Sequence, residues 1–243
     1  TRSAFVTGVQ TCALPISLLV KPASGQIANK GTICIIPDGV LWNLPFQALV
    51  TSSDHYLLED HALYSAPSLN VLREMARGRS GKENNAASLL AFGNPIIGKD
   101  AQRDEERCPL PEAETEVTTV AKTFGSAGSK VFIGREASEK TFRALAPTYA
   151  MIHLATHGVI DNRQPLYSHL LLTSTEADAE NDGRLEAREI MNLKLNADLA
   201  VLSACETANG RIAPGEGVMG MSWSFFLAGT SVQIGRASCR ERV

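Results

Sequence analysis

The stretch Leu199-Ala200-Val201-Leu202-Ser203-Ala204-Cys205-Glu206-Thr207 decides the fold class that the sequence predicts. An apolar run that ends abruptly in small and polar residues is typical of a buried strand in a parallel sheet. Ligands of open α/β sheets bind outside the carboxyl ends of the strands. Because Cys205 stands where this strand ends, the stretch predicts a thiol at the ligand-binding edge of an α/β sheet.

A second stretch, Ala150-Met151-Ile152-His153-Leu154-Ala155-Thr156-His157-Gly158, has the same strand pattern and ends in a histidine and a glycine. A thiol needs a nearby base, or a cation that lowers its pKa, in order to attack at neutral pH. An imidazole supplies either of these. The two strand ends therefore predict a catalytic pair of His157 and Cys205, with the N–H groups of Gly158 and Cys205 stabilising an oxyanion.

The composition narrows the class of protein. A chain of 243 residues with 44% hydrophobic residues can bury the core of one large domain or of two small ones. The net charge of −3 gives no basic surface, so we expect no contact with nucleic acid. No apolar run approaches the roughly 20 residues that cross a bilayer, so we expect no membrane partner.

The cysteine pattern also bounds the chemistry. The five cysteines are scattered, and no two of them form a Cys-x-x-Cys pair. The pattern therefore disfavours a zinc knuckle or a thioredoxin-type site, and we expect no metal site. An odd number of cysteines without a disulfide framework suits a reducing compartment, which favours a cytoplasmic protein.

Strand and helix patterns alternate along the chain, which predicts a mostly parallel central sheet with flanking helices and right-handed crossovers. Besides the two stretches quoted above, the predicted strands are 32–36, 88–93, 130–133 and 169–173. The predicted helices are 62–77, 111–124, 138–145, with Ser138 as its cap, 185–193 and 218–227. Three glutamates, Glu112, Glu114 and Glu116, crowd the start of helix 111–124. The positive end of the helix dipole explains them better than catalysis does.

The two ends of the chain differ in character from the rest. Residues 1–16 and 234–243 resemble translations of paired sequencing adapters. Segments of this kind are excluded from reasoning about the fold. We therefore expect one partial α/β domain over residues 17–233, between two non-native segments.

A family resemblance rests on the two strand ends. His153-Leu154-Ala155-Thr156-His157-Gly158 and Leu202-Ser203-Ala204-Cys205-Glu206-Thr207-Ala208 resemble the two signature blocks of the CHAT domain family. This family comprises caspase-like cysteine peptidases, related to caspases and separase and often attached to tetratricopeptide repeats. Further blocks agree in order, namely Pro37-Asp38-Gly39 with Leu44-Pro45-Phe46, Phe92-Gly93-Asn94-Pro95, Leu110-Pro111 with Glu112 and Glu116, Asp182-Gly183-Arg184-Leu185, Gly215-Glu216-Gly217 and Phe226-Leu227-Ala228-Gly229.

The resemblance implies a caspase-like three-layer sandwich and a His157–Cys205 dyad that cleaves protein or peptide substrates through a thioester, without a cofactor. It also implies a regulatory partner that binds through tetratricopeptide repeats missing from this chain. Members of the family continue past the equivalent of Ala228-Gly229 with a further strand, helices and loops that form the substrate pocket. We therefore expect the sheet to be truncated at its C-terminal edge, and a truncated, inactive fragment stays an open alternative.

Other interpretations of the same residues remain open. His153 and His157 lie four apart on one face of a strand, and Cys205 would make a third metal ligand. A structural zinc site needs four ligands, so His153 is better interpreted as supporting the site by hydrogen bonding. A catalytically silent scaffold and a different acyl transfer on the same dyad are further alternatives.

Two carboxylates follow the members of the dyad in sequence. Asp161 and Glu206 are candidates for reading a basic substrate side chain through an ion pair. Both residues are equally well interpreted as solvated loop carboxylates.

Overall fold

The computed structural model describes residues 15–51, 55–66, 68–73, 88–97, 109–161, 163–174, 180–204, 211–213, 217–219 and 221–235. The chain divides into two compact units. The smaller unit comprises residues 1–72 and 212–217, and the larger comprises residues 73–211 and 218–243. The residues predicted to carry the chemistry belong to the larger unit.

The smaller unit contains a two-stranded parallel sheet of β1 (Thr32–Ile35) and β2 (Ala62–Ser65). Its small core consists of Phe46, Leu49 and Leu57, with partly buried residues such as Leu63 packed against it. The prediction of a helix over 62–77 is wrong at its start, because residues 62–65 pair with β1. Helical residues follow at 69–73. The short helices of this unit are η1 (Ile16–Val20), η2 (Lys21–Ala23), α2 (Ser24–Ile27), η3 (Gly39–Asn43), η4 (Phe46–Ala48) and α3 (Leu57–Asp60).

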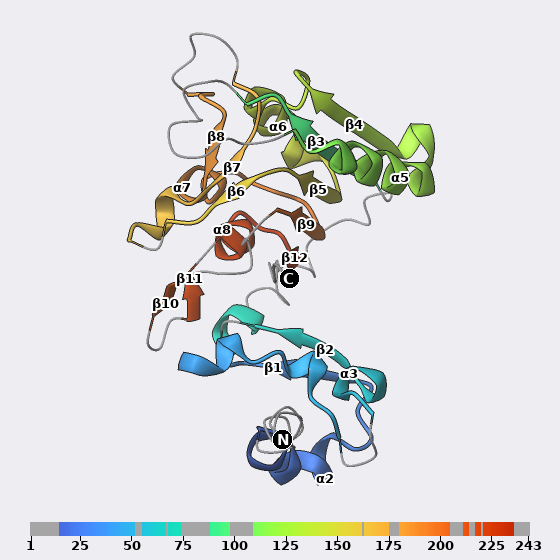
Figure 1. Ribbon diagram of the computed structural model, residues 1–243, viewed down its shortest axis with the longest axis vertical. Coiled ribbons are helices and arrows are strands. Elements are labelled where there is room, and N and C mark those ends of the chain that lie inside the picture. The colour runs from blue at the N-terminus through green and yellow to red at the C-terminus, as the bar shows by residue number, and fades with distance from the viewer. Residues whose placement is uncertain are drawn as a thin grey trace, which may run out of the picture. The chain divides into compact units, whose positions relative to one another are not determined.

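The larger unit is built on a five-stranded sheet in which every strand is parallel to its neighbours. The spatial order is β12-β9-β5-β3-β4, as Figure 1 shows. The strands are β3 (Leu89–Pro95), β4 (Ser129–Gly134), β5 (Met151–Ala155), β9 (Leu199–Ser203) and β12 (Val232–Gly235). The predicted mostly parallel α/β sheet is confirmed, and β5 stands at its centre.

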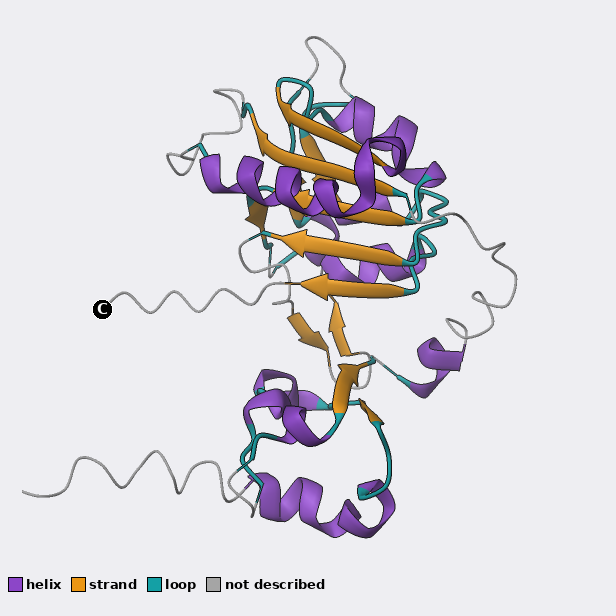
Figure 2. Ribbon diagram, turned by 90° about the vertical axis from the view of Figure 1, so that its right-hand side faces the viewer, coloured by secondary structure: helices purple, strands orange, loops and turns teal. Residues whose placement is uncertain are grey.

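Helices cover both faces of this sheet (Figure 2). On one face, alternate strand residues such as Ala91 and Ala155 pack against Val117 of α5 (Pro111–Gly128). On the other face, Phe92 and Leu154 belong to the larger core. That core also contains residues of α6 (Glu139–Leu145), α7 (Ala187–Ile190) and α8 (Met221–Leu227). Because side chains alternate between the faces of a strand, both faces of this sheet are apolar, and three layers result.

A second, antiparallel sheet follows β5 directly in the chain. It contains β6 (Gly158–Val159), β7 (His169–Leu171) and β8 (Arg184–Glu186). The prediction of a helix from residue 185 is therefore wrong at its start, because residues 184–186 pair with β7 before α7 begins. The remaining described elements are η6 (Ala146–Thr148), η7 (Pro165–Tyr167), β10 (Arg211–Ala213) and β11 (Gly217–Met219).

The strand β12 forms the C-terminal edge of the sheet, where truncation is expected. It pairs with β9 in the register Val232–Leu199 to Gly235–Leu202. Its last two residues belong to the segment 234–243 that resembles adapter sequence. Four residues of β12 thus pair along the outer side of β9. That residues 1–16 and 234–243 derive from sequencing adapters stays a prediction.

The start of α5 is fastened to the carboxyl end of β3. The Asn94 side chain accepts the Leu110 N–H at 2.7 Å and donates to Glu114 at 2.6 Å. A Cβ on Gly93 would lie 2.8 Å from the Ala113 carbonyl oxygen and from a Val117 methyl group. The helix therefore approaches β3 more closely than any side chain at this position allows, and its first turns lie at the carboxyl edge of the sheet.

Glu139 is a fully buried carboxylate that ties α6 to its surroundings. One of its oxygens lies 2.8 Å from Nε and 2.7 Å from Nη2 of Arg143, and the other accepts the Gly183 N–H at 2.8 Å. Arg143 also reaches Glu189 of α7 at 2.8 Å. Burial raises the pKa of Glu139 above its ordinary value, although the bond to Arg143 opposes this shift.

Replacing Glu139 by glutamine removes the titratable group and keeps an oxygen acceptor for Gly183. Because the folded-state pKa of Glu139 is raised, the folded protein holds this proton more tightly than the unfolded chain does. The resulting stabilisation is complete below the unfolded pKa and is lost as the pH rises through the folded pKa. We expect the free energy of unfolding of wild type, relative to that of Glu139→Gln, to fall from about pH 4 upwards and then level off.

Equilibrium urea unfolding of both proteins between about pH 4 and about pH 8 measures this difference. A difference that rises with pH would show that the carboxylate, rather than the protonated acid, is favoured by folding.

Candidate functional site

The two predicted strand ends lie side by side in the sheet. β5 and β9 are parallel neighbours, and Leu154 pairs with Leu202 and Ala155 with Ser203. His157 follows two residues after Ala155. Cys205 and Glu206 lie outside the described residues. The structure therefore brings together the two strands that precede the predicted dyad. Of the dyad itself, His157 lies within the described residues.

His157 occupies the turn between β5 and β6 and is half-buried. Its carbonyl oxygen accepts the N–H of Leu171 at 2.9 Å. This bond flanks the antiparallel pair of Gly158 and Leu170, which is therefore the pair type that exchanges no hydrogen bonds. The N–H of the buried Gly158 consequently points away from β7, and its role as an oxyanion donor stays a prediction.

Thr156 anchors the same turn from the inside. Its buried hydroxyl donates to the carbonyl oxygen of Leu171, whose N–H is already bonded to His157. Both backbone groups of one β7 residue thus fix the chain where β5 ends. Thr156 was not predicted as part of the site, and its place between the end of the strand pattern at Ala155 and the candidate His157 was the available signal.

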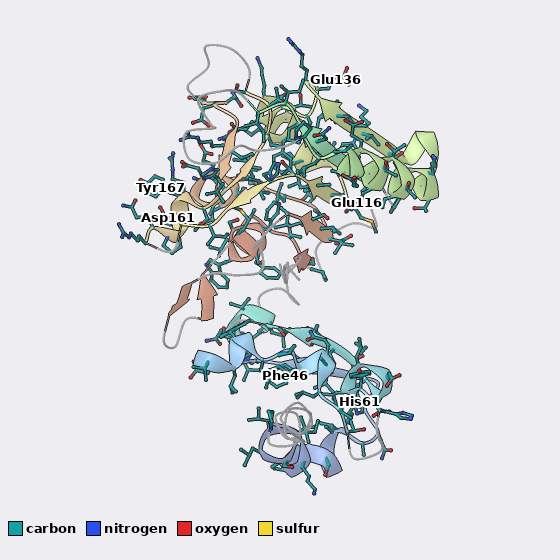
Figure 3. All side chains as sticks on the ribbon, in the orientation of Figure 1. Phe46, His61, Glu116, Glu136, Asp161 and Tyr167 are labelled. Carbon is teal, nitrogen blue, oxygen red and sulfur yellow. The ribbon has the colours of Figure 1, made fainter. Side chains whose placement is uncertain are left out.

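Glu116 of α5 links β5 to β9. One carboxylate oxygen lies 2.7 Å from Nε2 of His153, and the other accepts the Ser203 hydroxyl at 3.1 Å. His153 is buried, with 6% of its surface exposed, whereas the Glu116 side chain is 37% exposed. Figure 3 labels Glu116 on the helix. The carboxylate therefore joins the middle of β5 to the carboxyl end of β9.

This arrangement adds to the interpretation of the helix glutamates. Helix polarity stays the prediction for these residues as against catalysis, and the Glu116 carboxylate in addition bonds to two strands. The proposed supporting role of His153 through hydrogen bonding fits its contact with Glu116. The three side chains do not form a nucleophilic triad, since the carboxylate and not the imidazole stands in the middle.

Asp161 closes a tight turn after β6. Its Oδ1 accepts the N–H groups of Arg163 at 2.8 Å and Gln164 at 2.9 Å, and its own N–H donates to Ser168 at 3.0 Å. These backbone bonds lower the pKa of Asp161, so the side chain carries a negative charge at neutral pH. Figure 3 labels Asp161 in this loop. A role in reading substrate charge stays a prediction.

Two further findings concern the described part of the chain. Within the residues that the structure covers, no three or more His, Cys, Asp or Glu side chains gather in a way that could hold a metal ion. No helix in those same ranges has the length and apolar character that a bilayer span requires.

Comparison with known proteins adds a family. The CHAT domain family matches residues 10–238 of the chain. Tetratricopeptide repeat protein 28 of Mus musculus is 22% identical over 243 residues, a match that covers 85% of this chain and 10% of that protein. The chain thus spans about a tenth of the length of this relative.

Proposed function

Because the chain belongs to the CHAT domain family, we propose that it is a cysteine endopeptidase whose catalytic dyad is His157 and Cys205. Both residues stand in sequence blocks that resemble the family's two signatures. Proteins and peptides are the proposed substrates. The chemistry needs no cofactor, because a thiolate and an imidazole suffice for acyl transfer.

One observation carries this proposal, namely the register of β5 and β9. Ala155 pairs with Ser203 in a parallel ladder, and His157 and Cys205 each follow two residues later. Neighbouring strands lie about 4.8 Å apart. If the two chains continue in register beyond this pair, the His157 and Cys205 side chains start on adjacent strand ends, from which their rotamers can bring the thiol and the imidazole within the hydrogen-bond distance that proton transfer requires.

The proposed reaction follows from these groups. His157 takes the proton of the Cys205 thiol, and the sulfur attacks the carbonyl carbon of the scissile peptide bond. The N–H groups of Gly158 and Cys205 stabilise the oxyanion. His157 then protonates the leaving amine as the C–N bond breaks, and a thioester remains. Water activated by His157 attacks the thioester, which releases the acid and returns the proton to sulfur.

The proposed setting of the reaction goes beyond this chain. A parent protein with tetratricopeptide repeats would bind a regulatory partner through them. The relative from Mus musculus is named for such repeats. We also propose a cytoplasmic location, where the Cys205 thiol stays reduced.

The first test is the reactivity of the thiol. Iodoacetamide labelling of Cys205 in the full chain, followed by mass spectrometry of its peptide, should slow by roughly tenfold at pH 7 in His157→Ala, because the fraction of thiolate falls when the imidazolium is lost. His169→Ala, which removes an imidazole that bonds the Tyr167 carbonyl instead, is the control and should label like wild type. Equal rates in wild type and His157→Ala would identify Cys205 as a plain thiol and favour a silent scaffold.

The second test is peptide cleavage and its charge preference. Asp161→Asn keeps the oxygen that accepts the two turn N–H groups and removes the negative charge. If Asp161 reads a basic side chain, kcat/KM for basic substrates should fall about tenfold while kcat/KM for apolar substrates stays constant, as expected for one lost ion pair. An equal change for both substrate classes removes this role. Failure to cut any peptide of a library, with Cys205 still reactive, would contradict proteolysis itself.

A further inference from the structure

We propose that Glu116 is a positioning residue for the dyad, which holds the ends of β5 and β9 in fixed mutual placement through His153 and Ser203. This inference rests on the proposed function, because it concerns the same two strand ends. It gives a role to a buried imidazole and a carboxylate that the reaction itself does not use.

The geometry of the three side chains supports the role. Glu116 contacts each strand with a different oxygen, His153 at 2.7 Å and Ser203 at 3.1 Å. Ser203 stands opposite Ala155 in the ladder, so the two bonded residues lie diagonally across neighbouring strands. A slide of one strand along the other would lengthen one of these bonds. The carboxylate therefore opposes the motion that would separate the two strand ends.

The distance in sequence to the dyad is short on both sides. His153 precedes His157 by four residues, and Ser203 precedes Cys205 by two. Beyond Ala155 and Ser203 no further ladder pair joins these two strands within the described residues. Glu116 thus links the middle of β5 to the last paired residue of β9, shortly before the residues whose separation decides proton transfer. A misplacement of about 1 Å at a reacting group can cost on the order of a hundredfold in rate.

Glu116 is itself held in place. The start of α5 is bonded to Asn94 at the end of β3 through the Leu110 N–H and Glu114. The close approach of the helix at Gly93 leaves no room for it to move inward. Because α5 is fixed to β3, Glu116 ties β5 and β9 to a helix that is itself held in place. The two strands are therefore positioned by α5 as well as by their own pairing.

Four variants of the full chain test the proposal. Glu116→Ala removes both bonds, and Ser203→Ala removes one of them. Glu116→Gln removes the negative charge. The glutamine amide can still accept a hydrogen bond from Ser203 and donate one to His153. Glu112→Ala is the matched control, because Glu112 is an exposed glutamate in the first turn of the same helix.

We expect Glu116→Ala to slow labelling of Cys205 about tenfold and to lower kcat by ten- to a hundredfold, with KM changed by less than about threefold. Ser203→Ala should lower kcat by a smaller factor. Glu116→Gln should restore most of the rate, and Glu112→Ala should match wild type. Thermal unfolding of each variant identifies those that remain folded, and Ser203→Ala and Glu116→Gln keep the test decisive if Glu116→Ala unfolds.

The outcomes separate this inference from the proposed function. If wild-type labelling does not depend on His157, the dyad fails, and the positioning role fails with it. If labelling depends on His157 but is unchanged in folded Glu116→Ala and in Ser203→Ala, only the positioning role is overturned. A rate in folded Glu116→Gln as low as that of Glu116→Ala would assign the effect to charge and contradict positioning by hydrogen bonds.

Discussion

The proposed site depends on one interaction, the parallel pairing of β5 with β9. It places two strands next to each other at the centre of a sheet that is buried on both faces, so their carboxyl ends open at one edge. Every group assigned to the chemistry follows one of these strands or contacts both. Glu116 adds a side-chain link from the middle of β5 to the last paired residue of β9. The sheet thus brings together the two strands that precede the proposed dyad, and His157 itself lies in the turn after β5.

The turn after β5 carries two of the groups proposed for the site, His157 and Gly158. Thr156 and His157 bond the two backbone groups of Leu171, which holds the antiparallel sheet against the end of β5. The same register leaves the Gly158 N–H directed away from β7. One short segment therefore presents an imidazole and a backbone donor together. Buried Glu139 helps to fix the antiparallel sheet from farther away, because it joins α6 to Gly183, directly before β8.

Local signals in the sequence predicted much of the larger unit. The helix begins at Pro111 as expected, and Ser138 caps α6 by accepting the Thr141 N–H, because such signals act over three or four residues. Residues 62–65 and 184–186 became strands through pairing with distant segments, which local periodicity does not encode. The role of Glu116 was missed for the same reason, since its partners lie 37 and 87 residues away. The predicted pairing of Cys205 with His157 concerns a residue outside the described ranges and stays a prediction.

The most direct measurement is a crystal structure of the chain with Cys205 and His157 both ordered. We predict that the Cys205 Sγ and one ring nitrogen of His157 lie within about 4 Å of each other, with the Gly158 N–H facing the space beside the sulfur. A sulfur on the opposite edge of the sheet, or one that no turn of either side chain brings near the imidazole, would contradict the central claim.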